Sequence, residues 1–479
     1  MLFSEPTFLF FFLPAVLLFY FLSGDRLRNW VLAGASLAFY AWGEHTYVLV
    51  LLVSIVLNWA CGLAIGRAAD RAQARRPLTV GIVGNLLLLV GFKYTNFLVD
   101  NLDVALVALG RPPLRIAHVH LPIGISFFAF QGMSYVIDVY RGLYPPQKSL
   151  LNLAMYKSFF PQLIAGPIVR YVDIKNEVER RCVTTADFAA GVRRFVIGLG
   201  KKMVIANVMA RPADAIFALA PHERTAGLAW VAVVSYALQI YFDFSGYSDM
   251  AIGLGRMFGF HFRENFAHPY VATSMTDFWR RWHISLSSWF RDYLYIPLGG
   301  NRVSAARQYA NLATVFLLCG LWHGASWNFA IWGLFHGAFL IAERRLKLTA
   351  APAPWALPLR HAYVTLVVLV SWVFFRADTL AASTSTLAAM FGLGHATASA
   401  PGLGMFVDRE VVLTGLLGIV ASTPVLGALT RAADRWKAQR PTSAWLVESG
   451  QLAALVGTLG YSTMLIAAGS YSPFIYFRF

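Results

Sequence analysis

Two histidines, His323 and His336, stand in a long stretch of sequence that carries no charged side chain. Residues 311–342 include no Asp, Glu, Lys, Arg or Tyr, so these imidazoles are the groups there that can move a proton near neutral pH. Ionisable groups at membrane depth are costly and usually face a cavity or another helix. His323 is therefore either a functional residue or a histidine that only hydrogen-bonds a neighbouring carbonyl.

A second segment, residues 274–293, places His283 among aromatic and basic side chains. Ser274 and Asp277 fit the capping box that starts a helix, and aromatic or apolar residues then recur every three or four positions. The spacing predicts an amphipathic or re-entrant helix on the cytoplasmic side of a membrane. This helix is either a lipid-surface anchor or, through His283, a second carrier of protons.

A lone carboxylate, Asp243, lies well inside the apolar run 225–255. There it needs a hydrogen-bonding or cationic partner, or it protonates. It is either a structural clamp, which we favour from the sequence, or a residue that lines a polar cavity.

The composition indicates the class of protein. Hydrophobic residues make up 58% of the chain and charged residues 13%, whereas soluble domains carry roughly 25% charged residues. We therefore predict an all-α polytopic membrane protein. The net charge is +16, and the Lys and Arg residues cluster in short loops between the apolar runs. This distribution favours the lipid bilayer over nucleic acid as the partner of these charges. The three cysteines have neither metal-binding nor disulfide spacing, and we expect no metal site.

Apolar runs recur along the whole chain and predict about ten to twelve membrane elements in one membrane-embedded domain, residues 1–479. Residues 151–169 carry Pro161 and Pro167 and are expected to be broken or re-entrant. The runs cover residues 7–22, 30–42, 46–66, 78–99, 119–140, 151–169, 188–220, 225–255, 311–342, 361–375, 411–430 and 451–470.

The loop charges predict the orientation of the chain. Arg26 and Arg28 follow the first run, and four arginines in residues 67–76 follow the third. Because short basic loops stay cytoplasmic, the N-terminus is expected outside. Another basic loop, residues 431–440, precedes the last run, so the C-terminus is expected outside as well. The first run lacks a basic start and a small-residue cleavage site, and we expect it to be a retained span.

Several motifs together resemble the membrane-bound O-acyltransferase family, and within it the bacterial branch that acts in alginate O-acetylation. They are residues 121–128 (LPIGISFF), 160–168 (FPQLIAGPI), 241–250 (YFDFSGYSDM), 278–286 (FWRRWHISL), 295–301 (YIPLGGN), 321–324 (LWHG), 372–377 (WVFFRA) and 473–477 (PFIYF).

The resemblance implies transfer of an acyl group, in the first place acetyl from cytoplasmic acetyl-CoA, towards hydroxyls of an extracellular polysaccharide such as alginate. The family histidine of the Trp-His-Gly motif corresponds to His323, and the second functional histidine corresponds to His283. The resemblance further implies tilted helices around a central funnel or tunnel in a bacterial inner membrane. It also implies a separate extracytoplasmic acetyltransferase or acceptor protein, and no permanently bound cofactor.

The chemistry assigns roles to these residues. A neutral imidazole can take the proton of a hydroxyl that attacks a thioester, so we expect His323 to be the general base and His283 to orient it or line the tunnel. Trp322, Trp327 and Asn328 are expected to wall the tunnel beside Asp243 and to polarise the thioester carbonyl, although aromatic residues at this spacing more often serve plain packing.

Four basic residues are candidates for binding the phosphates of CoA: Arg280, Arg281, Lys201 and Lys202. The alternative is that each only contributes to the positive-inside pattern.

A competing interpretation is a transporter or flippase, since buried His and Asp with broken helices also describe a substrate or proton pathway. The sequence shows no two halves with matched interrupted helices, which favours the enzyme. An acyltransferase must release free CoA, whereas a transporter consumes no thioester.

Overall fold

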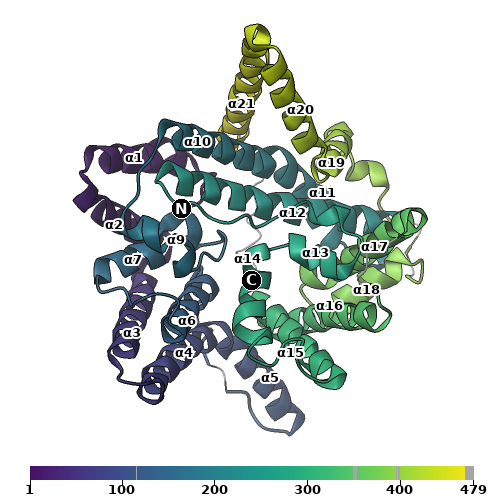
Figure 1. The fold of residues 1–479 in the computed structure, drawn as a ribbon. Coiled ribbons are helices and arrows are strands. Elements are labelled where there is room, and N and C mark those ends of the chain that lie inside the picture. Colours follow the sequence, from purple (N-terminus) through teal and green to yellow (C-terminus); the bar gives the residue numbers. More distant parts are fainter. Residues whose placement is uncertain (115, 349–352, 395, 398–399, 470–479) are drawn as a thin grey trace. The chain divides into compact units, whose positions relative to one another are not determined.

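The computed structural model describes residues 1–114, 116–348, 353–394, 396–397 and 400–469 (Figure 1). Every regular element within these ranges is a helix. The predicted all-α membrane class is therefore confirmed. The described residues form two compact units, Met1–Val192 with Ala251–Arg263, and Arg193–Met250 with Glu264–Phe479. The single domain and the central funnel stay predictions.

Unit 1 contains the N-terminal helices. The boundary between the units falls inside two long helices, α10 (Thr185–Gly200) and α12 (Ala226–Met257). The other elements of unit 1 are η1 (Phe8–Phe12), α1 (Leu13–Leu22), α2 (Asp25–Glu44), η2 (His45–Tyr47), α3 (Val48–Arg67), α4 (Arg71–Lys93), α5 (Thr95–Ala108), α6 (Ile125–Arg141), α7 (Leu150–Ser158), α8 (Phe160–Leu163) and α9 (Tyr171–Glu179).

The predicted break in residues 151–169 is confirmed in unit 1. Helix α7 ends at Ser158, and the single turn α8 follows with Pro161 in its first turn. A proline there removes an amide that would be unpaired anyway. The whole broken stretch from Phe159 to Val169 is buried in protein.

Unit 2 carries both candidate histidines. Its elements are η3 (Lys201–Ala206), α11 (Asn207–Phe217), η4 (Pro221–Glu223), η5 (Pro269–Val271), α13 (Met275–Arg281), α14 (Ile284–Phe290), η6 (Arg291–Tyr295), α15 (Ala305–His323), α16 (Trp327–Arg345), η7 (Pro354–Ala356), α17 (Leu357–Arg376), α18 (Leu380–Met390), η8 (Leu403–Met405), α19 (Arg409–Ala421), α20 (Val425–Gln439), η9 (Pro441–Ser443) and α21 (Ala444–Ala467).

Helices α15 and α16 pack side by side at very short distance (Figure 1). A Cβ atom on Gly320 would collide with the carbonyl oxygen of Phe329, and one on Gly333 with that of Phe316. Two glycines therefore let the backbones touch. The contact fixes the two histidines of these helices, His323 and His336, relative to each other.

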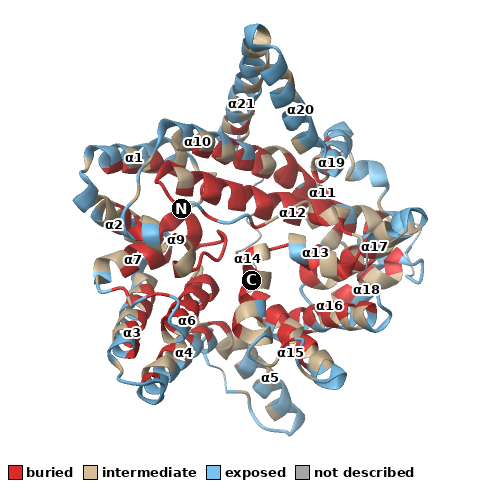
Figure 2. Cartoon of the chain, viewed as in Figure 1, coloured by how far each residue is buried: buried red, intermediate tan, exposed pale blue. Residues whose placement is uncertain are grey.

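Five segments of the described chain are long and apolar enough to cross a membrane, or six if the pair α19 and α20, bent by 65°, forms one span. The five are Asp25–Arg67, Arg71–Lys93, Ala226–Met257, Pro354–Arg376 and Pro441–Ala467. Helix α21 is apolar, yet Ser462 is its single buried residue (Figure 2), as is typical of a helix that faces lipid. The count of ten to twelve elements stays a prediction, and the predicted C-terminal position and the motif at 473–477 lie outside the described residues.

Candidate active site

The predicted helix over residues 274–293 is broken in the structure. Helix α13 begins as expected, with Ser274 Oγ accepting from the Asp277 amide at 3.0 Å, but it ends at Arg281, and α14 starts at Ile284. His283 occupies the break in the left-handed region, with φ of 43°. Histidine tolerates this conformation better than most residues, but it still costs free energy, and such residues cluster at functional sites.

The aromatic face of this segment points into protein and not into lipid. Phe278, Trp282 and Trp289 are buried, and the Trp282 ring packs 4.9 Å from that of Trp372. The carboxylate of Glu343 in α16 accepts hydrogen bonds from the amides of Met275 and Thr276. It thereby caps α13 where the helix dipole is positive. The lipid-anchor alternative is therefore wrong for this face.

The break delivers His283 to a site that also contains His323. The His283 side chain is fully buried, and its ring centre lies 6.3 Å from that of His323. Phe244 of α12 packs edge-on against His283 at 4.6 Å, and Trp322 lies 6.0 Å away. The Nε2 atom of His283 is buried without a hydrogen-bond partner in the part of the chain that the structure describes. The two histidines that the sequence singled out therefore lie together.

The other histidine, His323, ends α15 inside an aromatic cage. It is 6% exposed, and the rings of Trp322, Trp332 and Phe375 lie 5.0 to 5.1 Å from its own. Gly324 ends the helix in extended conformation. The imidazole is thus presented at a helix end in an apolar environment, where water is excluded and electrostatic interactions are strong.

Burial favours the neutral form of His283. This residue lies outside the segments that are long and apolar enough to cross a membrane, and burial lowers the pKa of its imidazole, since desolvation penalises the charged form. At cellular pH the side chain is neutral. It can therefore accept a proton or a hydrogen bond through one ring nitrogen.

A third buried histidine, His336, lies next to this pair, and no role was predicted for it. Trp332 stands between the two rings, 5.1 Å from His323 and 4.8 Å from His336. The indole nitrogen of Trp279 donates to His336 Nδ1 at 3.4 Å. The sequence feature that could have indicated a role for His336 is its position in the charge-free stretch 311–342.

The predicted tunnel-wall residues divide into three cases. Trp322 is buried against both histidines. Trp327 is 57% exposed at the start of α16, so it is on the surface of unit 2. Asn328 is buried, but its amide group donates to the Ala377 carbonyl and to Ser383 Oγ. Both of its N–H donors thus serve the junction of α16 with α17 and α18, which argues against their use on a thioester carbonyl. The wall of the tunnel and the polarisation of the carbonyl stay predictions.

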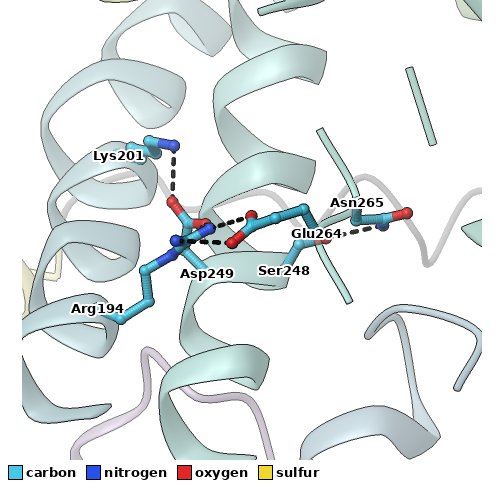
Figure 3. A network of polar contacts seen from close by, with 6 residues as sticks. All are labelled: Arg194, Lys201, Ser248, Asp249, Glu264 and Asn265. Atoms are coloured by element: carbon cyan, nitrogen blue, oxygen red, sulfur yellow. Dashed lines mark hydrogen bonds and ion pairs between the residues drawn. The ribbon is translucent and has the colours of Figure 1, made fainter. Parts of the chain in front are cut away.

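The two lysines that were expected to bind CoA form ion pairs within the protein. The Lys202 ammonium lies 2.6 Å from the Asp243 carboxylate, and both side chains are buried. Lys201 pairs with Asp249 at 2.7 Å (Figure 3). Asp243 thus has the cationic partner that its burial requires, Lys202 of the π-helical turn η3, and this pairing favours the role of a clamp, which stays a prediction. A free phosphate-binding role does not fit either lysine.

The arginines of the motif differ from each other. Arg281 pairs with Asp277 at 2.9 Å on the same helix, whereas Arg280 is exposed and lines a pocket of about 390 Å³. Arg291 and Arg344, which were not among the predicted CoA-binding residues, line the same pocket. Its wall includes Trp279 and Cys319, and Cys319 stands one helical turn before His323. We call this cavity the cationic pocket, defined by Arg280, Arg291 and Arg344. Its wall residue Trp279 lies 5.2 Å from the ring of His336.

The described residues contain no group of three or more His, Cys, Asp or Glu side chains that could hold a metal ion.

Comparison with known proteins gives one consistent family. A family model described as MBOAT, membrane-bound O-acyltransferase family, matches residues 143–383. The probable alginate O-acetylase AlgI of Azotobacter vinelandii is 43% identical over 503 residues, with the full length of both chains covered. A peptidoglycan O-acetyltransferase of Helicobacter pylori is 38% identical over 82% of this chain and 80% of its own.

A more distant relative is the teichoic acid D-alanyltransferase of Bacillus subtilis. It is 29% identical over 46% of this chain and 58% of its own length. The similarity to O-acetylating proteins thus covers more of the chain than the similarity to the D-alanylating one.

Proposed function

Because the chain belongs to the membrane-bound O-acyltransferase family, we propose that it moves acetyl groups from cytoplasmic acetyl-CoA towards hydroxyls of an extracellular polysaccharide. The protein is a multi-pass membrane acyltransferase. Alginate is the proposed acceptor, because a relative that is covered over its full length is named for alginate O-acetylation. The inner membrane, with both termini outside, is the proposed location.

The observation that carries this proposal is the pair of buried histidines, His283 and His323, with ring centres 6.3 Å apart. In the proposed reaction the hydroxyl oxygen bonds to the acetyl carbonyl carbon, and the bond from that carbon to sulfur breaks. His323 takes the hydroxyl proton and passes it to the departing sulfur, so that CoA leaves as a free thiol. The aromatic cage excludes water, which would otherwise hydrolyse the thioester.

The cationic pocket supports acyl-CoA as the donor. Arg280, Arg291 and Arg344 place guanidinium groups around one cavity, and guanidinium is well suited to bidentate binding of phosphate. Arg291 is paired with Asp292 at 2.7 Å, and the pocket still keeps an excess of positive charge. The thioester arm would extend from these phosphates along Trp279 towards the histidines.

A partner is proposed for the last step. The sequence contains no Gly-x-Ser-x-Gly motif of hydrolase-type acyl transfer. An extracytoplasmic acetyltransferase or acceptor protein would therefore receive the acetyl group and complete its transfer to the polysaccharide.

The test is release of free CoA from acetyl-CoA by the purified protein in liposomes, with and without periplasmic extract. We expect His323→Ala to lower the rate by about 10²- to 10⁴-fold, the usual contribution of a general base. His283→Ala should also lower it. Each variant must first elute as a monodisperse peak, so that lost activity is separated from lost folding.

His118→Ala is the matched control, since this histidine lies in unit 1 with 71% of its side chain exposed. It should release CoA at the wild-type rate. A rate in His323→Ala within twofold of wild type would contradict the role of this residue as base. No CoA release by any sample, together with substrate flux across liposomes, would favour the transporter.

A further inference from the structure

A loop residue, Asn265, makes a set of hydrogen bonds at the break between α13 and α14. Its backbone carbonyl accepts from the Ile284 amide at 2.9 Å. Its side-chain Oδ1 accepts from the Ser285 amide at 3.2 Å and from Ser285 Oγ at 2.9 Å. The first amides of α14 are thus capped by a residue that lies outside the helix.

The same side-chain oxygen lies 3.2 Å from His283 Nδ1. A backbone amide can only donate, so the Asn265 atom that faces the Ser285 amide must be the carbonyl oxygen and not the NH₂ group. That oxygen can only accept. Ser285 Oγ also lies 3.4 Å from His283 Nδ1, but its single proton is directed to Asn265 Oδ1 at the shorter distance of 2.9 Å. Both neighbours of Nδ1 therefore act as acceptors, and this arrangement favours a proton on Nδ1 and the lone pair of the neutral ring on Nε2.

The NH₂ group of Asn265 is fixed from the other side. It donates to Ser248 Oγ of α12 at 3.0 Å (Figure 3). The neighbours of these two residues are joined by a second link, since Arg194 binds Asp249 at 2.6 Å and Glu264 at 2.5 Å. Two parallel connections between α12 and the loop hold the amide in one orientation.

We propose that Asn265 is a positioning residue that keeps His283 in the tautomer with its proton on Nδ1 and its lone pair on Nε2. The proposal rests on the proposed acyltransferase function. Nε2 is fully buried and has no hydrogen-bond partner among the described residues, so it is the atom that meets the reacting groups. In this tautomer His283 accepts a hydrogen bond from a donor at the reaction centre, and when protonated it cannot.

Two substitutions separate this role from simple capping. Asn265→Ala removes the side-chain oxygen that accepts from His283 Nδ1. Without this acceptor, nothing from residue 265 favours one His283 tautomer over the other. Asn265→Asp keeps an acceptor for the amides of α14, but it places a negative charge beside His283, which favours imidazolium and raises its pKa. A second titratable group, His323, faces the His283 ring, while Arg194, Lys201, Asp249 and Glu264 form a charged cluster on the far side of Asn265.

The experiment is ¹⁵N NMR of histidine-labelled protein, with the His283 signal assigned by its loss in His283→Gln, together with CoA release as a function of pH. Wild-type His283 should show a protonated Nδ1 and an unprotonated Nε2. Asn265→Ala should mix the tautomers and lower kcat about 10- to 100-fold, the scale of loss known for hydrogen-bond partners that orient metal-bound histidines, with little change in KM. Asn265→Asp should move the acidic limb of the rate profile to higher pH.

Asn85→Ala is the matched control, because this buried asparagine of unit 1 hydrogen-bonds Asn58 and the Gly81 carbonyl. It should lower the unfolding temperature and leave the pH profile and the His283 signal unchanged. An unaltered His283 signal in Asn265→Ala, or an acidic limb that stays in place in Asn265→Asp, would overturn the proposal. If wild-type protein releases no CoA, the proposed function fails, while the NMR signal still decides the role of Asn265.

Discussion

At the scale of the residue, the cations of unit 2 divide into those that hold helices together and those that remain for a ligand. Lys201 and Lys202 sit in the π-helical turn η3, which directs both ammonium groups to carboxylates of α12. Arg280 is exposed instead. The division follows from burial, because a buried charge is stable only when it is paired.

The buried pair of Lys202 and Asp243 yields a prediction about stability. Lys202→Met leaves the Asp243 charge without this partner and should lower the free energy of unfolding by about 3–5 kcal/mol. The double variant Lys202→Met with Asp243→Leu removes both charges and should recover most of the loss. Thermal unfolding in detergent, with CoA release measured alongside, checks both variants.

The double variant also decides the role of Asp243. If Asp243 is only a clamp, any pair of side chains that packs well at positions 202 and 243 is sufficient. The double variant should then recover CoA release together with stability. Restored stability without restored CoA release would contradict the clamp and assign Asp243 to the tunnel.

Single residues could be predicted from the sequence where their chemistry is unusual for their surroundings. His323 stood out because the flanking residues are apolar, and Asp243 because it is a carboxylate in a long apolar run. Asn265 could not be found in this way, since an asparagine in a polar loop is ordinary. Its role depends on Ser285 and His283, and that contact exists only after the chain folds.

At the scale of the element, helix boundaries could be predicted where a local signal sets them. Ser274 starts α13 as expected, and Pro161 marks the broken run in unit 1. The break at His283 could not be predicted, because the aromatic spacing continues through it from Phe278 to Trp289. Hydrogen bonds from the distant loop at Asn265 stabilise two short helices in place of one.

Close packing of α15 and α16 gives the prediction at this scale. Gly333→Ala places a Cβ against the Phe316 carbonyl, and should destabilise the protein by about 1–3 kcal/mol. Because the two helices carry His323 and His336, separating them should also slow CoA release. Unfolding temperature and CoA release measure the two effects.

Gly450→Ala in α21 is the control, since a Cβ there meets nothing within 4 Å. It should leave the unfolding temperature unchanged or slightly higher, because alanine favours the helix. If Gly333→Ala and Gly450→Ala lowered the unfolding temperature and CoA release equally, the close contact of α15 and α16 at Gly333 would not be needed for stability or activity.

At the scale of the whole molecule, the orientation in the membrane is a property of charge and not of packing. The chain carries 40 Lys and Arg residues against 24 Asp and Glu, and its short basic loops are expected in the cytoplasm. In unit 1 the Arg181 guanidinium binds Asn29 at 2.7 Å. Residues next to Arg181 therefore lie on the same side as the basic loop at Arg26 and Arg28.

Cys182 makes this orientation measurable without adding a residue. It is exposed, whereas Cys61 and Cys319 are buried, so a maleimide that does not cross membranes should react at this one position among the three cysteines. Since Cys182 follows Arg181 on the predicted cytoplasmic side, inverted vesicles should be labelled and intact spheroplasts should not. Cys182→Ser should abolish labelling in both. Labelling of intact spheroplasts that disappears in Cys182→Ser would reverse the orientation, place the N-terminus in the cytoplasm, and require another explanation for the arginines at 26 and 28.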